Sequence, residues 1–333
     1  MSATAFPPSR HSYRDILQVS DEVADAVATD KPVVALESTI YTHGAMGKDL
    51  AREHEELVRS HGGIPAIIAI VDGVPRVGVT PAEIVRMIED KGTVKVSRRD
   101  VSYLVGMGLA GRKINGGTTI AGTMLLARLA GIRVFGTGGL GGVHRGGENS
   151  MDISADLTEL GRTRVAVVSS GSKGFLDIPR TLEFLETQGC LVSTFADGRT
   201  GNVDFPAFWA RDSGCKSPST VYTEREAAAI ILAQEKLGIE SGMLLANPIP
   251  EEFAIPAAEI GSAIEQAVRE AEEKGFTGST NTPYVLGRLK ELTGDKAYVA
   301  NKALVRSNIV RATRVAVELS SLLSPNSQPA PSS

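Results

Sequence analysis

Short apolar runs alternate with longer helical segments along this chain, and this alternation constrains the fold more than any other feature. The runs PVVAL (32–36), PAIIAIV (65–71) and MLLA (243–246) have the length and composition of buried strands. Helical segments separate them, and one opens on a capping box formed by Thr80 and Glu83. Strands that alternate with helices are typical of a parallel sheet. The sequence therefore predicts an α/β fold with a largely parallel central sheet.

The pattern also predicts where individual elements lie. The expected strands are 32–36, 65–71, 73–79, 94–97, 132–135, 165–168, 191–194 and 243–246. The expected helices are 13–27, 48–61, 80–91, 116–131, 179–189, 223–237, 257–274, 283–293 and 298–323. Residues 196–214 have no periodicity and predict a long loop, a kind of segment that is often functional. We expect one domain over residues 13–323, between a disordered N-terminus (1–12) and a disordered tail (324–333).

Composition narrows the class of protein. The chain has 333 residues, 42% hydrophobic, which is long enough for a sizeable core. Its net charge of −4 and lack of a basic stripe argue against a nucleic-acid surface. Cys190 and Cys215 have neither metal-ligand nor disulfide spacing, which favours reduced thiols in an intracellular protein. No apolar run approaches the ~20 residues of a membrane span, and no signal peptide is visible. We therefore expect a cytoplasmic protein, with organellar targeting left open.

A glycine-rich turn follows the strand expected at 132–135. Its residues from Gly136 to Gly141 match G-x-G-x-x-G, and Asp156 stands twenty residues after Gly136, where a ribose-binding acid could lie. A dinucleotide site also requires a helix that opens at the third glycine. The continuation GVHRGG cannot form one, so this interpretation is disfavoured. Consecutive N–H groups without Cβ atoms can still form a nest that binds an anion.

Polar side chains follow this turn. His144 and Arg145 stand between glycines, which favours a position in a cleft over one on the surface. Asp152, Ser154 and Asp156 alternate, so in an extended segment they face one way and suit a divalent cation such as Mg²⁺ or Mn²⁺. The alternative is that Asp156 caps a helix starting near Leu157. Spacing alone does not decide between these two roles.

Lys173 follows the strand expected at 165–168 through a run of small residues. A desolvated lysine there can lose its proton and attack a carbonyl carbon to form a Schiff base. A solvated lysine at the start of a loop is the simpler interpretation of its position. Glu37, at the carboxyl end of another strand, is either a general acid or a partner for its loop. Lys95 with Arg98 or Arg99 could hold a phosphate, although surface charge is the simpler explanation.

Taken together, these motifs resemble one known family. VALESTIYTHG, KVSRRD, NGGTTIAGTM, FGTGGLGGVHRG, MDISADLTEL, SGSKGFLDIPRTLEFLETQG, ANPIPEEFA and ANKALV occur in the order of the pseudouridine-5′-phosphate glycosidases, a family also labelled indigoidine synthase A-like. The resemblance extends over nearly the whole chain, from about residue 16 to 320. It implies a three-layer α/β/α fold, a homotrimer and a divalent cofactor, typically Mn²⁺.

The resemblance also implies an activity. This is the reversible cleavage of the C–C glycosidic bond of pseudouridine 5′-phosphate, which gives uracil and ribose 5-phosphate in pseudouridine catabolism. Lys173 matches the covalent nucleophile, Glu37 the proton donor and Asp152 the metal position. The positions that match substrate-binding residues are Lys95, Ile120, Thr137, His144, Ser154, Ala155, Asp156 and Asn301. We expect a small-molecule substrate, with neither a nucleic-acid polymer nor a membrane as partner.

Two other functions are compatible with the same residues. One is a Schiff-base lyase or aldolase that acts on another sugar phosphate. The other is a sugar-phosphate sensor without catalysis. The loop at 44–49, which is shorter than is usual in the family, makes this function plausible. Release of uracil from pseudouridine 5′-phosphate distinguishes the glycosidase from the lyase and from the sensor.

Overall fold

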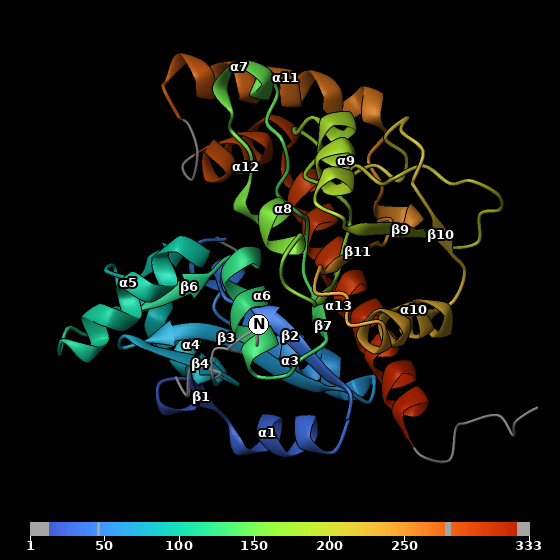
Figure 1. The fold of residues 1–333 in the computed structure, drawn as a ribbon. Helices are drawn as coiled ribbons and strands as arrows, with labels where there is room; N and C mark the ends of the chain where they lie inside the picture. The colour runs from blue at the N-terminus through green and yellow to red at the C-terminus, as the bar shows by residue number, and fades with distance from the viewer. Residues whose placement is uncertain (1–12, 45–46, 277–280, 325–333) are drawn as a thin grey trace, which may run out of the picture.

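The computed structural model describes residues 13–44, 47–276 and 281–324, and Figure 1 shows their arrangement. The strands are β1 (Gln18–Val19), β2 (Val33–Glu37), β3 (Ile64–Val71), β4 (Val74–Val77), β5 (Val94–Val96), β6 (Gly116–Thr118), β7 (Val134–Gly136), β8 (Ala166–Ser169), β9 (Leu191–Phe195), β10 (Thr220–Val221) and β11 (Met243–Ala246). The helices are α1 (Asp21–Ala28), α2 (Thr39–Thr42), α3 (Leu50–Ser60), α4 (Pro81–Glu89), α5 (Arg98–Leu109), α6 (Ile120–Leu129), α7 (Gly147–Ser150), α8 (Ala155–Leu160), α9 (Ile178–Thr187), α10 (Glu224–Lys236), α11 (Ala257–Glu273), α12 (Asn281–Thr293) and α13 (Asp295–Leu323), with 3₁₀ turns η1 (Tyr13–Asp15) and η2 (Glu251–Phe253).

The strands join in one sheet whose main path runs β1-β4-β3-β2-β7-β8-β11-β9-β10. β5 and β6 attach beside it through β3. Among the strands described, β3 pairs antiparallel with β4 and β6, and the other pairs are parallel. The predicted α/β class with a largely parallel sheet is confirmed.

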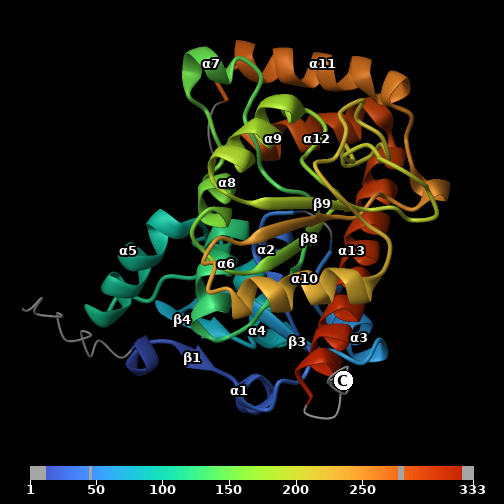
Figure 2. The same cartoon turned by 45° about the vertical axis from the view of Figure 1, so that its right-hand side comes forward.

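Helices cover both faces of this sheet, because successive side chains of a strand point to opposite faces. In β2, Val34 and Leu36 face the core formed with α3, α10 and α13. Val33 and Ala35 face the second core, formed with α1, α5, α6, α8 and α9. Figures 1 and 2 show these two layers on either side of the strands. A strand buried on both faces needs a continuous apolar run, which is why β2 and β3 were recognisable in the sequence.

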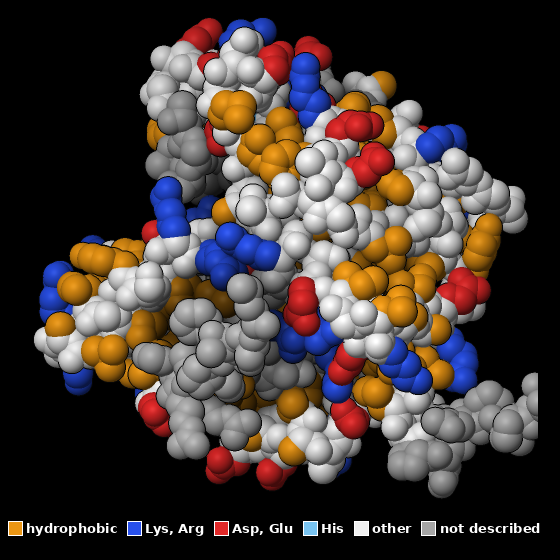
Figure 3. Space-filling view, viewed as in Figure 1, with side chains coloured by type: hydrophobic (Ala, Val, Ile, Leu, Met, Phe, Trp, Pro, Cys, Tyr) orange, Lys and Arg blue, Asp and Glu red, His pale blue; other side chains and the backbone are white. Residues whose placement is uncertain are grey.

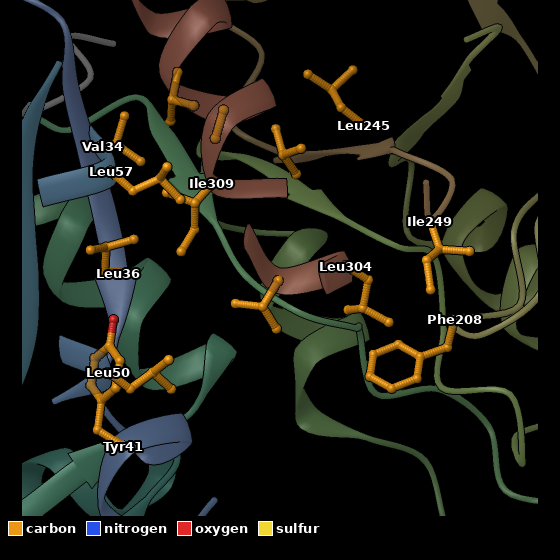
Figure 4. Close-up of a cluster of buried hydrophobic side chains, with 14 of the residues drawn as sticks. Val34, Leu36, Tyr41, Leu50, Leu57, Phe208, Leu245, Ile249, Leu304 and Ile309 are labelled. Atoms are coloured by element: carbon orange, nitrogen blue, oxygen red, sulfur yellow. The ribbon is translucent and has the colours of Figure 1, made fainter. Parts of the chain in front are cut away.

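The long helix α13 joins the sheet to the segment 196–214. Leu304 and Ile309 belong to its buried face, and Figure 4 shows Leu304 beside Phe208. Within the segment, Phe205, Phe208 and Trp209 are at most 2% exposed. The predicted loop therefore lacks helices and strands but is packed into the core. It fills the space between α13 and the ends of the strands.

Two predicted helices differ from the structure, and one long helix was not predicted. The helix expected at 13–27 begins only at Asp21, because Gln18–Val19 pairs with β4 as an edge strand. The first residues of the helix expected at 116–131 form strand β6 instead, because Gly116 and Gly117 pair with both β3 and β5. A Cβ on Gly116 would lie 2.4 Å from Val96 of β5. Helix α5 was not predicted, although a capping box of Ser97 and Asp100 opens it.

Some predictions fall outside what the structure tests. Residues 1–12, most of the tail (325–333) and part of the short loop at 44–49 lie outside the described residues. The single-domain assignment stays a prediction. Among the described helices, none combines the length and apolar character needed to cross a membrane.

A pair of leucines tests the contribution of α13 to stability. Leu304 is 0% exposed, whereas Leu237, at the end of α10, is 74% exposed. We expect Leu304→Ala to lower the free energy of unfolding by about 2–5 kcal/mol, because it removes buried methyl groups and leaves a cavity. Leu237→Ala should change it by less than about 0.5 kcal/mol. Urea denaturation followed by circular dichroism measures both, and equal losses would contradict this packing.

Candidate active site

The registers of three neighbouring parallel strands bring distant residues together. Ala35 of β2 is paired with Phe135 of β7, which is paired with Val167 of β8. Two residues further on, Glu37 and Thr137 therefore stand at the same level, with Ser169 next to them. The Thr137 hydroxyl donates a hydrogen bond to Oε1 of Glu37, across one hundred residues of sequence. This edge, where the strands end, is where α/β proteins bind ligands.

Glu37 is held in an environment that favours its neutral form. Burial raises the pKa of its carboxyl group to about 7, and this effect exceeds all opposing ones. The Thr137 hydroxyl and the positive charges of Lys173 and Lys95 lower the pKa, and the carboxylate of Asp156 raises it. A carboxyl group that is partly protonated near neutral pH can act as a general acid.

Lys173 lies beside the glycine-rich turn. Its backbone N–H donates to the Leu140 carbonyl at 3.1 Å, and Leu140 pairs with Ser172. A Cβ atom on Gly139 would lie 3.5 Å from Cγ of Lys173, so the lysine side chain passes along the turn. Lys173 is half-buried. The structure therefore places the half-buried lysine along the turn, where its charge acts on Glu37, and not at the start of a solvated loop.

Lys95 and His144 belong to the same electrostatic neighbourhood. Burial lowers the pKa of Lys95, and the positive charge of Lys173 lowers it further, against Asp156 and Glu37. Burial also lowers the pKa of His144, opposed by Asp152 and aided by Lys173. Two amines, an imidazole and three carboxyl groups thus influence one another at one end of the sheet. Figure 3 shows Lys and Arg side chains (blue) along a notch in the surface. The notch lies between α5 and the part of the molecule that contains α7 and α12, above α5 in the view of Figure 1.

Asp156 supports two neighbouring segments. Its Oδ1 accepts the N–H of Ala121 at 3.1 Å, near the start of α6, and its Oδ2 accepts the N–H of Gly141 at 3.1 Å. The hydroxyl of Ser154, not Asp156, caps α8. The expectation that Asp156 caps its own helix is wrong: its carboxylate stabilises α6 and ends the glycine-rich turn.

Asp152 is the remaining candidate for a metal ligand. Its Oδ2 lies 3.9 Å from Nδ1 of His144. Within the described ranges, no group of three or more His, Cys, Asp or Glu side chains could hold a metal ion. Both oxygens of Asp156 accept backbone N–H groups, so Asp152 is the carboxylate of this alternating set that is left for a cation. One carboxylate fits a cation of the Mg²⁺ or Mn²⁺ type, which often takes its other ligands from water and substrate oxygens.

The other predicted positions differ in their surroundings. Ile120 starts α6 and is 3% exposed in the core, and Ala155, which starts α8, is exposed. Asn301 is half-buried on α13. Arg145 is exposed, which favours a surface position over one in a cleft. Arg98 forms an ion pair with the fully buried Glu159, which explains its charge without a phosphate.

Two residues that support the site have no recognisable signal in the sequence. Phe208 has a left-handed backbone (φ 62°) that costs energy for a bulky residue, and its N–H donates to the Ser170 carbonyl at 3.0 Å. A Cβ on Gly139 would lie 2.5 Å from the Phe208 ring, so only glycine fits there. Asn308 of α13 is fully buried and hydrogen-bonded to the same turn. Both residues form hydrogen bonds with backbone groups in segments that are neither helix nor strand.

The fold and the site define a class: an α/β protein with a lysine and a protonatable carboxyl group at the carboxyl edge of a parallel sheet. The family model "Indigoidine synthase A like protein" matches residues 22–318. The chain belongs to this family.

Named relatives and solved structures agree with this assignment. A pseudouridine-5′-phosphate glycosidase from Nocardioides sp. is 47% identical over 92% of this chain and 98% of its own. One from Arabidopsis thaliana is 42% identical over 95% and 94%. The crystal structure of the prealnumycin C-glycosynthase AlnA in complex with ribulose 5-phosphate is 36% identical, with a TM-score of 0.82 over 92% and 98%. An indigoidine synthase A-like protein from Thermotoga maritima is 33% identical, with a TM-score of 0.80 over 92% and 97%.

The role of Asp156 predicts a stability effect. In Asp156→Asn, the amide NH₂ would face one of the N–H groups that the carboxylate now accepts. We expect the free energy of unfolding to fall by about 1–3 kcal/mol, the range for an unsatisfied buried polar group. Asp21→Asn, at an exposed first-turn position of α1, is the matched control and should cost less than about 1 kcal/mol. Equal stability of Asp156→Asn and wild type in urea would contradict the structural role.

Proposed function

We propose that this chain is a pseudouridine-5′-phosphate glycosidase in which Lys173 binds the sugar and Glu37 protonates the departing uracil. The observation that carries the proposal is that the charge of Lys173 acts on Glu37, a carboxyl group whose pKa burial raises to about 7. Relatives up to 47% identical over nearly their whole length are named for this activity.

The reaction explains why a proton donor is needed. The bond to be broken joins C1′ of the ribose to C5 of uracil, and carbon does not leave as a stable anion. Protonation at C5 lets the bonding electron pair stay with the uracil ring. Glu37 supplies that proton in its neutral form, which burial maintains near neutral pH. Thr137 holds the carboxyl group in position through its hydrogen bond.

Lysine supplies the other half of the chemistry. The amine of Lys173 forms a bond to C1′ while the C1′–O4′ bond of the ribose ring breaks, so that O4′ gains a proton and the attacking nitrogen loses one. As the C1′–C5 bond breaks, the nitrogen lone pair forms the imine and the proton from Glu37 reaches C5. Water then adds to the imine and releases ribose 5-phosphate together with the free amine. The reverse sequence joins uracil to the sugar, so the reaction is reversible.

The remaining polar residues bind and orient the substrate in this proposal. Lys95 offers a positive charge to the sugar phosphate, and His144 lies beside Asp152. Asp152 would hold a Mn²⁺ ion or another divalent cation, which supplies positive charge for substrate oxygens when bound. We also propose a homotrimer in the cytoplasm, as the family resemblance implies.

A second function shares this machinery. AlnA, with a TM-score of 0.82, is described as a C-glycosynthase in complex with ribulose 5-phosphate. That observation favours, as the alternative, a lyase or synthase on another sugar phosphate. Ultraviolet absorbance separates the two functions, because only the glycosidase releases uracil from pseudouridine 5′-phosphate.

Borohydride trapping tests the nucleophile. We expect ribose 5-phosphate with sodium borohydride to leave a reduced adduct on Lys173, because hydride converts the imine to a stable secondary amine. Peptide mass spectrometry locates the adduct. Lys173→Arg keeps the charge but forms no imine and should give no adduct. Recovery of the adduct on another lysine, or its absence from the wild type, would contradict the assignment of Lys173 as the nucleophile.

The acid is tested by its pH dependence. Since Glu37 must be protonated, kcat/KM for uracil release should fall as the pH rises through about 7. Thr137→Val removes a hydrogen bond that favours the carboxylate, so the pKa of Glu37 should rise and the descending limb should move to higher pH. Glu37→Gln should still form the lysine adduct with ribose 5-phosphate but lose uracil release. Full activity of Glu37→Gln would remove Glu37 as the acid.

A further inference from the structure

Asn308 connects α13 to the glycine-rich turn through a fully used side chain. Its Nδ2 donates to the carbonyls of Thr137 at 2.8 Å and Gly138 at 2.9 Å. Its Oδ1 accepts from Ser170 Oγ at 3.2 Å and from Asn247 Nδ2 at 3.0 Å. Two carbonyl acceptors require the amide nitrogen on that side, so the orientation of the amide is fixed by its partners.

These contacts set the direction of two peptide groups. No peptide in the described residues is cis, and in a trans peptide the N–H points opposite to the C=O. Because the Thr137 and Gly138 carbonyls point to Asn308, the N–H groups of Gly138 and Gly139 point away from it. Neither N–H is hydrogen-bonded within the described chain, whereas Thr137 donates to Val168 at 3.0 Å and Leu140 to Gly171 at 2.9 Å.

The two N–H groups lie between the proposed catalytic residues. Gly138 and Gly139 are buried, and buried N–H groups without a partner are rare in proteins. The residue before them, Thr137, hydrogen-bonds Glu37, and the Lys173 side chain passes along Gly139. A ligand oxygen bound there would be next to the carbon that Lys173 attacks.

We infer that the N–H groups of Gly138 and Gly139 form a donor pair for an oxygen of the sugar-phosphate ligand, and that Asn308 is the positioning residue that orients them. The inference rests on the proposed function, since it assigns a subsite of the same site. The acceptor oxygen belongs either to the phosphate or to the sugar. In both cases two aligned dipoles meet a negative or partly negative oxygen in a buried turn.

A purely structural role for Asn308 is the competing explanation. Its bonds to Ser170 and Asn247 tie β8 and β11 to α13, and their loss would destabilise the fold in any case. The two roles differ in what they do to ligand binding in a protein that is still folded. The test therefore compares binding with stability.

Asn308→Asp is the informative variant, because it keeps the shape but turns a carboxylate oxygen toward the two carbonyls. We expect kcat/KM for uracil release to fall roughly 100-fold and the affinity for ribose 5-phosphate to fall roughly 10- to 100-fold. Thr313→Val, a fully buried position on α13 whose hydroxyl bonds only within the helix, should keep both within about threefold. The activity of Asn308→Asp relative to wild type should rise as the pH falls, because a protonated carboxyl group can donate again. If circular dichroism shows that Asn308→Asp is folded at every pH used, a purely structural role predicts no such recovery.

Binding of ribose and of inorganic phosphate identifies the oxygen. If Asn308→Asp weakens binding of inorganic phosphate but not of ribose, the pair holds the phosphate; the opposite result assigns a sugar oxygen. Unchanged affinity for ribose 5-phosphate in a folded Asn308→Asp protein would overturn the inference.

Hydrogen–deuterium exchange on the wild type covers the case in which the variant does not fold. Ribose 5-phosphate should slow exchange in the segment 137–141, and unchanged exchange at saturating ligand would also overturn the donor pair. Uracil release and the Lys173 adduct in the wild type report separately on the proposed function, so the two failures are distinguishable.

Discussion

The site depends on the parallel alignment of β2, β7 and β8. Parallel neighbours end at one edge, and their register places Glu37 beside Thr137 and one strand away from the segment that leads to Lys173. The same alignment partly buries Glu37, and loss of solvent is the largest cause of its raised pKa. A shift of one strand by a single residue would turn these side chains to the opposite face. The chemistry of the site is thus a consequence of sheet register.

Beyond the strands, buried polar side chains hold the site in place. The turn after β7 and the segment after β8 contain few regular hydrogen bonds, yet both are buried. Backbone groups in such segments need other partners. Asp156 accepts two N–H groups from one side, and Asn308 donates to two carbonyls from the other. Phe208, from the segment 196–214, fills the space that the glycines leave.

The strands with continuous apolar runs and the capped helices were predictable because their signals are local. Where the prediction was wrong, the structure of the segment depends on contacts with distant parts of the chain. Gly116 and Gly117 look like part of a small-residue helix, but pairing with β3 makes them a strand. Asp156 has the spacing of a helix cap or a metal ligand, and its real partners lie at Ala121 and Gly141. Asn308 lies in a helix that was predicted, but nothing in the neighbouring sequence indicates its contacts.

By itself, the sequence determined the α/β class, the order of the main strands and helices, and the residue types available for chemistry, because hydrophobic period and capping act over a few residues. The motifs around Lys173 and Glu37 also singled out both residues. Only the tertiary structure decided which of these polar groups meet, which are used to hold backbone, and which have a shifted pKa. Those properties depend on burial and on distances between residues up to 171 positions apart, as for Asn308 and Thr137. No short stretch of sequence contains that information.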